Sequence, residues 1–83
     1  MQVSVLAVPT HIVYPLSGFE GILVRARLWN DVTQSFTYLG EMENPGELFV
    51  DGLDPDQWYW IVIEEFDETQ GAWVRVQANW ISM

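Results

Sequence analysis

Few residues in this chain are of the types that perform covalent or acid–base chemistry. The 83 residues include one histidine, His11, and no cysteine or lysine. A nucleophile activated by a base would have to combine His11 with Ser4, Ser17, Ser35 or Ser82. None of these serines lies in a nucleophile-elbow sequence, and the lack of thiols removes disulfides, thiolate catalysis and cysteine-ligated metal centres. We therefore expect no catalytic residues, no enzymatic activity and no cofactor.

Carboxylates are more numerous, but their spacing does not suit catalysis. Glu64 and Glu65 are adjacent in a segment with the pattern of a strand. Glycoside hydrolysis needs two carboxyl groups that flank one bond, whereas neighbours on a strand point to opposite faces of the sheet. We expect Glu64 and Glu65 to lie on different faces, so that they do not act on one substrate.

A second acidic group falls in one predicted loop, where Asp51, Asp54 and Asp56 follow Glu47. Carboxylate oxygens are the ligands that calcium prefers, but this spacing lacks the central glycine and terminal glutamate of an EF-hand loop. Aspartate is also common in turns because its side chain accepts hydrogen bonds from the local backbone. We interpret these residues as turn and surface carboxylates and predict no metal site.

The charge balance limits the class of partner. Three arginines stand against twelve aspartates and glutamates, which gives a formal net charge of −9. Affinity for nucleic acids and for anionic membranes comes largely from cationic side chains, so we expect neither as a partner. No stretch approaches the roughly 20 apolar residues of a membrane span, and residues 1–9 lack the cationic start of a signal peptide. We expect synthesis in the cytoplasm without a leader, and the final location stays open.

The elements that position these residues are β-strands. Apolar and polar residues alternate with a period of two, and no window has the spacing of an amphipathic helix. Clusters of Gly, Pro, Asn and Asp separate seven candidate strands. These are Val3 to Val8, Thr10 to Tyr14, Gly21 to Trp29, Gln34 to Glu41, Glu47 to Val50, Tyr59 to Phe66 and Trp73 to Ile81. We predict one all-β domain over residues 1–83, a small antiparallel sandwich of about six or seven strands.

Two of the predicted turns have similar sequences. Residues 29–36 and 66–73 each begin and end with an aromatic residue and contain acidic and Thr-Gln residues between them. Asn and Asp accept local backbone hydrogen bonds at such turns, and Gly71 permits a positive φ. We predict two antiparallel hairpins, one pairing residues 21–29 with 34–41 and the other pairing 59–66 with 73–81.

The most specific local pattern is Leu53, then Pro55 two residues later, then Tyr59 at the start of a hydrophobic strand. This pattern resembles the E–F corner of fibronectin type III and related immunoglobulin-like domains. The resemblance covers residues 47–81 and implies an immunoglobulin-like sandwich. It also implies that the hydroxyl of Tyr59 bonds to the backbone of the corner and that Leu53 packs beside it.

Alternation assigns side chains to the two faces of the predicted sheet. The predicted inward residues are Ile22, Val24, Ala26, Leu28, Tyr59, Ile61, Ile63, Val74, Val76, Ala78 and Trp80, and Trp29 falls one residue out of phase. The predicted outward residues are Trp58, Trp60, Val62, Trp73, Arg75, Gln77 and Asn79. Soluble monomers rarely expose a contiguous apolar patch that binds nothing, and Trp and Arg are frequent interface anchors.

From this pattern we predict a partner-binding face made of Trp58, Trp60, Val62, Trp73 and Arg75. The alternative is that the N-terminal segment or a loop covers some of these tryptophans, or that the assignment of faces is off by one residue. The favoured function is a non-enzymatic structural or interaction module. In architecture such a domain resembles accessory subunits of tailed-phage particles, such as decoration, connector, tail or fibre proteins. That resemblance implies a protein partner in a virion-like assembly, with self-association or pairing through sheet edges near Pro9 to Pro15 as further modes.

Two other functions stay open. An inhibitor or adaptor would present an acidic surface made of Asp51, Asp54, Asp56, Glu64, Glu65, Asp67 and Glu68. A carbohydrate-binding module would stack sugar rings on Trp58, Trp60 and Trp73, with Gln77 or Asn79 as hydrogen-bonding neighbours. Salt separates the first from the favoured function, because binding through many acidic groups weakens steeply with ionic strength and burial of tryptophan does not.

Overall fold

The computed structural model describes residues 10–83, so the predicted strand Val3 to Val8 lies outside the described residues. The six strands are β1 (Ile12–Pro15), β2 (Leu23–Asn30), β3 (Ser35–Glu43), β4 (Glu47–Val50), β5 (Tyr59–Asp67) and β6 (Ala72–Ile81). Each begins and ends within two residues of its predicted bounds. Over residues 10–83 the chain forms no helix, which confirms the predicted all-β class. Residues 10–83 thus contain no helix that is long and apolar enough to cross a membrane.

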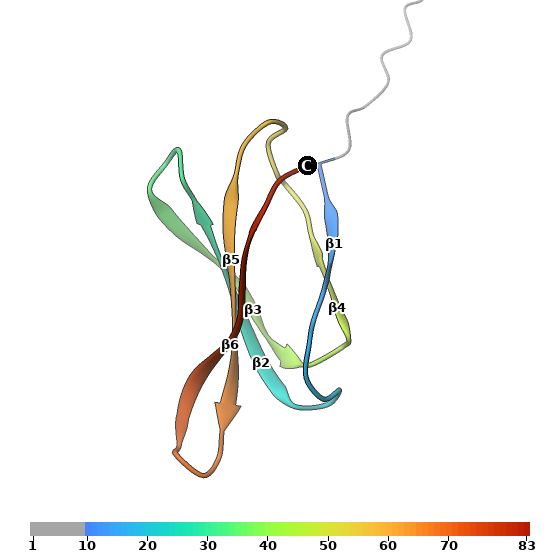
Figure 1. Ribbon diagram of the computed structural model, residues 1–83, viewed down its shortest axis with the longest axis vertical. Helices are drawn as coiled ribbons and strands as arrows, with labels where there is room; N and C mark the ends of the chain where they lie inside the picture. Colours follow the sequence, from blue (N-terminus) through green and yellow to red (C-terminus); the bar gives the residue numbers. More distant parts are fainter. Residues whose placement is uncertain (1–9) are drawn as a thin grey trace, which may run out of the picture.

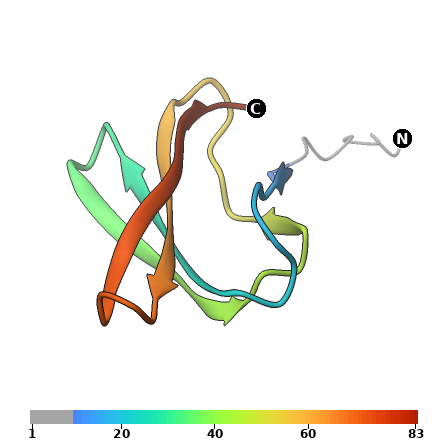
Figure 2. The same cartoon turned by 60° about the horizontal axis from the view of Figure 1, so that its bottom comes forward.

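The strands form two antiparallel sheets. β1 pairs with β4, and the larger sheet has the order β3-β2-β5-β6. Figure 1 shows the small sheet lying beside the larger one, and Figure 2 shows the same two layers from another direction. The predicted sandwich is therefore confirmed, and the inner faces of the two sheets enclose the core.

The core contains the residues that alternation places inward on β2 and β5. Its buried members are Tyr14, Val24, Ala26, Leu28, Val50, Leu53, Tyr59, Ile61, Ile63 and Ile81. β2 and β5 are the two central strands of the larger sheet, so each has a strand on both sides and the small sheet over its inner face. Their apolar alternation therefore determines which face of the larger sheet is buried.

Both hairpin turns have the same local structure. In the turn between β2 and β3, the side chain of Asn30 accepts the backbone N–H groups two and three residues later, and Asp67 does the same between β5 and β6. The residue four positions on has a positive φ in each turn, 57° at Gln34 and 64° at Gly71. That residue donates its N–H to the carbonyl of Asn30 or Asp67 at 2.8 Å. The two predicted hairpins and their shared turn chemistry are confirmed.

At the corner between β4 and β5, the hydroxyl of Tyr59 accepts the backbone N–H of Asp54 at 2.8 Å. The ring of Tyr59 is buried, and Leu53 is buried with it in the core. This is the hydrogen bond that the sequence pattern implied. It fixes the path of the chain from the small sheet to the larger one.

Replacing Tyr59 with phenylalanine should lower the free energy of unfolding by about 1 kcal/mol, because the N–H of Asp54 loses its acceptor while the ring stays packed. Urea unfolding of the wild type and of Tyr59→Phe measures the difference. Tyr38→Phe is the matched control, since the side chain of Tyr38 is 57% exposed. Equal stability of all three proteins would show that the corner hydrogen bond is not stabilising.

The face assignment predicted for β6 is right up to residue 75 and wrong beyond it. Glu64 lies opposite Arg75, but Ile63 lies opposite Gln77, so Val76 has no partner on β5. This extra residue is a β-bulge, and it reverses the alternation of the residues that follow. Gln77 and Asn79 therefore point inward, whereas Ala78 and Trp80 point outward.

Val74 lies on the inner side as predicted, but it is 37% exposed. Figure 1 shows that the hairpin of β5 and β6 extends past the end of the small sheet. The small sheet therefore does not cover the inner side of this hairpin.

Candidate functional site

The outer face of the larger sheet carries one aromatic residue from each of its four strands in a single row. Trp29 of β2 lies opposite Phe36 of β3 on one side and Trp60 of β5 on the other, and Trp60 lies opposite Trp80 of β6. Residues directly opposite each other in a sheet project from the same face. We call Phe36, Trp29, Trp60 and Trp80 the aromatic row.

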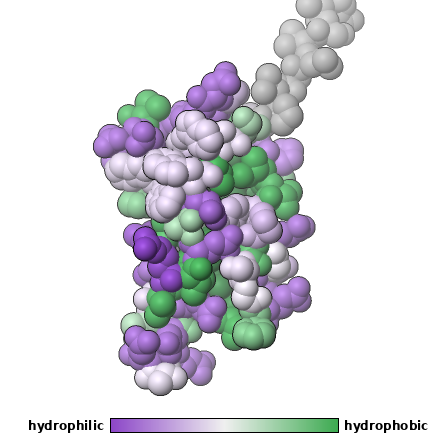
Figure 3. All heavy atoms as spheres, in the orientation of Figure 1, coloured by the Kyte–Doolittle hydropathy of each residue, from purple (hydrophilic) through white to green (hydrophobic). Residues whose placement is uncertain are grey.

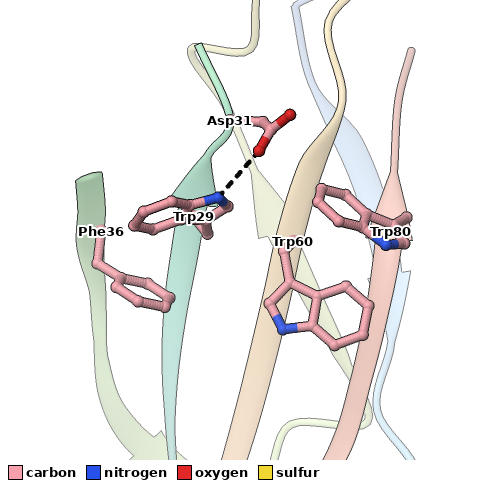
Figure 4. Close-up of a pocket in the computed structure, with 5 residues that line it drawn as sticks. All are labelled: Trp29, Asp31, Phe36, Trp60 and Trp80. Atoms are coloured by element: carbon pink, nitrogen blue, oxygen red, sulfur yellow. Dashed lines mark hydrogen bonds between the residues drawn. The ribbon is translucent and has the colours of Figure 1, made fainter. Parts of the chain in front are cut away.

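The rings of the row form two tilted pairs. The centroids of Trp29 and Phe36 are 4.9 Å apart, those of Trp60 and Trp80 are 5.2 Å apart, and both pairs are inclined by 57°. Figure 4 shows the two pairs side by side, with Asp31 above Trp29. A shallow depression of about 430 Å³ is lined by these four residues and Asp31.

A second depression of about 380 Å³ adjoins the first and is lined by Asp31, Trp58 and Trp80. Trp58 is 57% exposed and Trp80 is 50% exposed. Asp31 and Trp80 border both depressions. The two depressions therefore form one continuous aromatic surface with a single carboxylate. In Figure 3 pale spheres of intermediate hydropathy gather near the upper end of the molecule, with purple hydrophilic spheres beside them.

Ion pairs occupy the middle of the outer face. Glu64 Oε1 accepts a hydrogen bond from Arg25 Nε at 3.0 Å and lies 3.4 Å from Arg27 Nη2. The guanidinium of Arg25 lies 4.4 Å from the ring centroid of Trp73, and that of Arg27 lies 4.9 Å from the ring centroid of Phe36. Glu64 therefore holds two arginines, each of which packs on an aromatic ring.

The distribution of charge sets the outer face apart from the rest of the surface. By strand register, its charged residues are Arg25, Arg27, Arg75, Glu41, Glu43 and Glu64. These include all three arginines of the chain but only three of its twelve acidic residues. On its four strands the outer face is therefore neutral, and the nine other acidic residues, with Asp31 beside the aromatic row among them, account for the net charge of −9.

The residues of the predicted partner-binding face lie on this face, but they do not form one cluster. Trp58 and Trp60 lie at the end that bears the aromatic row, whereas Arg75 lies opposite Glu64 of the ion pairs and Trp73 lies further toward the other end. Val62 lies between them and is only 5% exposed. It points outward as predicted, but the larger residues around it on the same face leave little of its short side chain accessible.

Sequence reasoning missed three members of the aromatic row. Trp80 was assigned inward because the bulge at Val76 is not visible in the alternation. Trp29 was noted as out of phase with the inward residues of its strand, and this was a usable sign that it points outward. Phe36 received no assignment, although the aromatic residues at both ends of the first hairpin turn could have placed it opposite Trp29.

Gln77 and Asn79 were predicted outward beside the tryptophans, and this is wrong. Gln77 Nε2 donates to the hydroxyl of Tyr14 at 2.8 Å and to the carbonyl of Pro15 at 2.9 Å, and its Oε1 accepts the N–H of Ser17 at 2.9 Å. The hydroxyl of Tyr14 in turn donates to Asn79 Oδ1. These amides connect β6 to the end of β1, so both polar atoms of the Gln77 amide and the amide oxygen of Asn79 bond within the fold.

The phenol of Tyr14 should make the stability depend on alkaline pH. Burial raises the pKa of Tyr14 above its ordinary 10.0, and the hydrogen bond from Gln77 lowers it in part. The unfolded chain ionises this tyrosine first, so its contribution is complete below pH 10 and is lost as the pH rises through the raised pKa. Between about pH 9 and about pH 11, the urea midpoint of the wild type should fall more than that of Tyr14→Phe. Parallel curves would contradict this assignment.

Asp51 and His11 make contacts within the fold. Asp51 accepts hydrogen bonds from the backbone N–H of Gly52 at 2.8 Å and from Thr10 Oγ1 at 3.0 Å, which lower the pKa of its carboxyl group. His11 stacks on Phe49 with ring centroids 4.7 Å apart. Within residues 10–83 no three His, Asp or Glu side chains are grouped so as to hold a metal ion. Glu64 and Glu65 lie on opposite faces, as predicted.

Comparison with known proteins adds no relative. No protein-family model matches the sequence. Searches of curated protein sequences and of solved structures likewise gave no significant match. The geometry of the outer face is therefore the basis for the function proposed below.

Proposed function

We propose that this protein is a non-enzymatic interaction module that binds a protein partner through the aromatic row. One observation carries the proposal: four strands each contribute an aromatic side chain to one continuous, partly exposed row on the outer face. The strands and their ion pairs hold these rings in place before binding, which reduces the entropy that a partner must overcome. Aromatic residues and arginine are the side chains most often found at the energetic centre of protein interfaces.

A protein partner fits this surface better than a carbohydrate. The 57° tilt within each ring pair gives an uneven surface and not the flat one on which a sugar chain stacks. The two amides expected to bind sugar hydroxyls, Gln77 and Asn79, point to the other side of the sheet. Besides the indole N–H groups of the tryptophans, only Asp31 supplies a polar side-chain group among the residues that line the two depressions.

The outer face also fits better than the acidic surface. It is neutral, so a partner can approach it without matching a large charge. The acidic residues of that surface are divided between the corner before β5, both faces of β5 and the turn after it, which gives no single contact surface. We further propose that the fold is immunoglobulin-like, supported by the hydrogen bond of Tyr59, and that the protein is a subunit of a larger assembly. Its presence in a phage particle stays a prediction.

The proposal is tested with peptides selected from a random display library on the immobilised wild-type protein. Trp60→Ser should lower their affinity tenfold or more. Trp60 lines the first depression and lies opposite both Trp29 and Trp80, at the centre of the row. Phe19→Ser is the matched control, since Phe19 is 82% exposed in the loop between β1 and β2. Circular dichroism of both variants checks that they are folded.

Equal affinity for both variants would overturn the proposal. A steep loss of affinity between low and high salt, with no effect of Trp60→Ser, would favour the acidic-surface function. Binding of polysaccharides that Trp60→Ser abolishes, with no selected peptide bound, would favour the carbohydrate-binding function.

A further inference from the structure

We infer that the partner places a cationic side chain, arginine or lysine, in the depression between the aromatic row and Asp31. The inference rests on the proposed function and names the chemistry that the site recognises. The depression is lined by Trp29, Phe36, Trp60 and Trp80 together with Asp31. Aromatic rings attract a cation over their faces, and a carboxylate at the rim adds a direct charge.

The tilt of the rings suits a compact cation. Because the rings of each pair are inclined by 57°, their faces and edges border the depression from several directions. A cationic group placed there lies among the rings of both tilted pairs. Figure 4 shows Trp60 between the pair formed by Trp29 and Phe36 and the ring of Trp80, with the carboxylate of Asp31 directed toward Trp29.

Asp31 retains an oxygen for a ligand. Its Oδ1 accepts the indole N–H of Trp29 at 3.3 Å and the amide of Gln34 at 3.5 Å. Among the described residues no group donates a hydrogen bond to Oδ2. The contact with Trp29 also orients the carboxylate beside the ring that lines the depression.

None of the three arginines, all of which belong to the described residues 10–83, lines the site. Arg25 and Arg27 lie over Trp73 and Phe36 and pair with Glu64, and no arginine lines either depression. The chain therefore already places guanidinium groups on aromatic rings of this face, one of them Phe36 at the end of the aromatic row. Arg27 reaches the row at Phe36 but is paired with Glu64, and none of the three arginines lines the depression between the rings and Asp31.

Binding energetics favour a cationic over a neutral occupant. A partner that covered the depression with apolar side chains would remove water from Asp31 and give its charge no counterpart, which is costly. An arginine or lysine compensates that charge, and the net charge of −9 on the rest of the protein attracts a cationic partner as it approaches.

The test uses the ¹⁵N-labelled full chain and three capped tripeptides, Gly-Arg-Gly, Gly-Lys-Gly and the neutral analogue Gly-citrulline-Gly. The arginine and lysine peptides should shift the indole N–H resonances of Trp29, Trp60 and Trp80 saturably, with roughly millimolar dissociation constants. The citrulline peptide should bind about fivefold more weakly or worse. Asp31→Asn, which keeps the shape of the side chain, should weaken the arginine peptide by a similar factor.

Glu68→Gln is the matched control, because Glu68 is an exposed acid in the equivalent turn of the other hairpin and makes the same change of charge. Trp80→Leu should also abolish the preference for cations, and it removes a ring without touching the turn. Equal binding of the citrulline and arginine peptides, or an Asp31→Asn variant that binds like the wild type, overturns the inference.

The display experiment distinguishes this failure from failure of the proposed function. Selected peptides that lose affinity on Trp60→Ser but contain no arginine or lysine would leave the aromatic row as the binding site and refute the cationic occupant. Light scattering that shows self-association of the wild type, lost in Trp60→Ser, would place a second copy on the row and likewise refute it.

Discussion

Replacing Ile61 with alanine is expected to lower the free energy of unfolding by about 3 kcal/mol. Ile61 is 0% exposed and lies in the middle of β5, a central strand that pairs with β2 on one side and β6 on the other. The loss of three carbon atoms removes apolar area from the core and leaves a cavity that the surrounding strands cannot fill without moving. Small domains have little stability to lose, so this variant should be partly unfolded at 37 °C.

Urea unfolding followed by tryptophan fluorescence measures this effect. Ile61→Val should cost only about 1 kcal/mol, because it removes one methylene group. Val32→Ala is the surface control, since Val32 is 74% exposed in the turn between β2 and β3 and should change stability by less than about 0.5 kcal/mol. If Ile61→Ala were no less stable than Val32→Ala, Ile61 would not belong to the core.

Replacing Glu64 with glutamine is expected to lower the free energy of unfolding by about 2 kcal/mol. The side chain of Glu64 is 13% exposed, and those of Arg25 and Arg27 are 32% and 40% exposed. The substitution keeps the size of the side chain but removes the only acidic group that pairs with either arginine in residues 10–83. Two guanidinium groups then lie close together without a counterion, which raises the energy of the folded state.

Salt provides a second readout for this variant. The repulsion between the two arginines is screened at high ionic strength, so the deficit of Glu64→Gln should shrink between 0.05 M and 1 M NaCl, over which the Debye length falls to about 3 Å. Glu68→Gln, an exposed site in a turn, should show no deficit at either concentration. A deficit that does not change with salt would mean that lost packing and not charge explains the effect.

Glu64→Gln should also disturb the outer face itself. Arg25 packs on Trp73 and Arg27 packs on Phe36 while both are held by Glu64. Release of the arginines should change the fluorescence of Trp73 and loosen Phe36, an end member of the aromatic row. The ion pairs of Glu64 therefore also help to hold Phe36 of the aromatic row in place.

Much of the fold follows from local sequence patterns. Alternation in β2 and β5 identifies the core-facing residues correctly because both strands are regular over their central parts and have one face on the core. The two hairpins follow from Asn30 and Asp67, whose side chains bond to the next turn of backbone whatever the rest of the chain does. The bond from Tyr59 to the corner is equally local, spanning five residues.

The candidate site depended on interactions that the sequence does not encode locally. One extra residue in β6, Val76, reverses the alternation, and it takes the opposing strand to show that the residue is unpaired. This one bulge moves Trp80 onto the outer face and turns Gln77 and Asn79 toward β1. An alternation count has no means of placing a bulge, so every residue after it was assigned to the wrong face.

By itself, then, the sequence determined the all-β class, the strand bounds, the turns, the corner and the acidic charge, since each depends on residue type and on neighbours a few positions away. Only the tertiary structure decided which tryptophans share a surface. The aromatic row joins residues 29, 36, 60 and 80 through the register of three strand pairs, and the neutral outer face arises because those pairs also bring all three arginines together. Register is set by the packing of the whole sheet against the core, and for that reason it emerges only when the chain is folded.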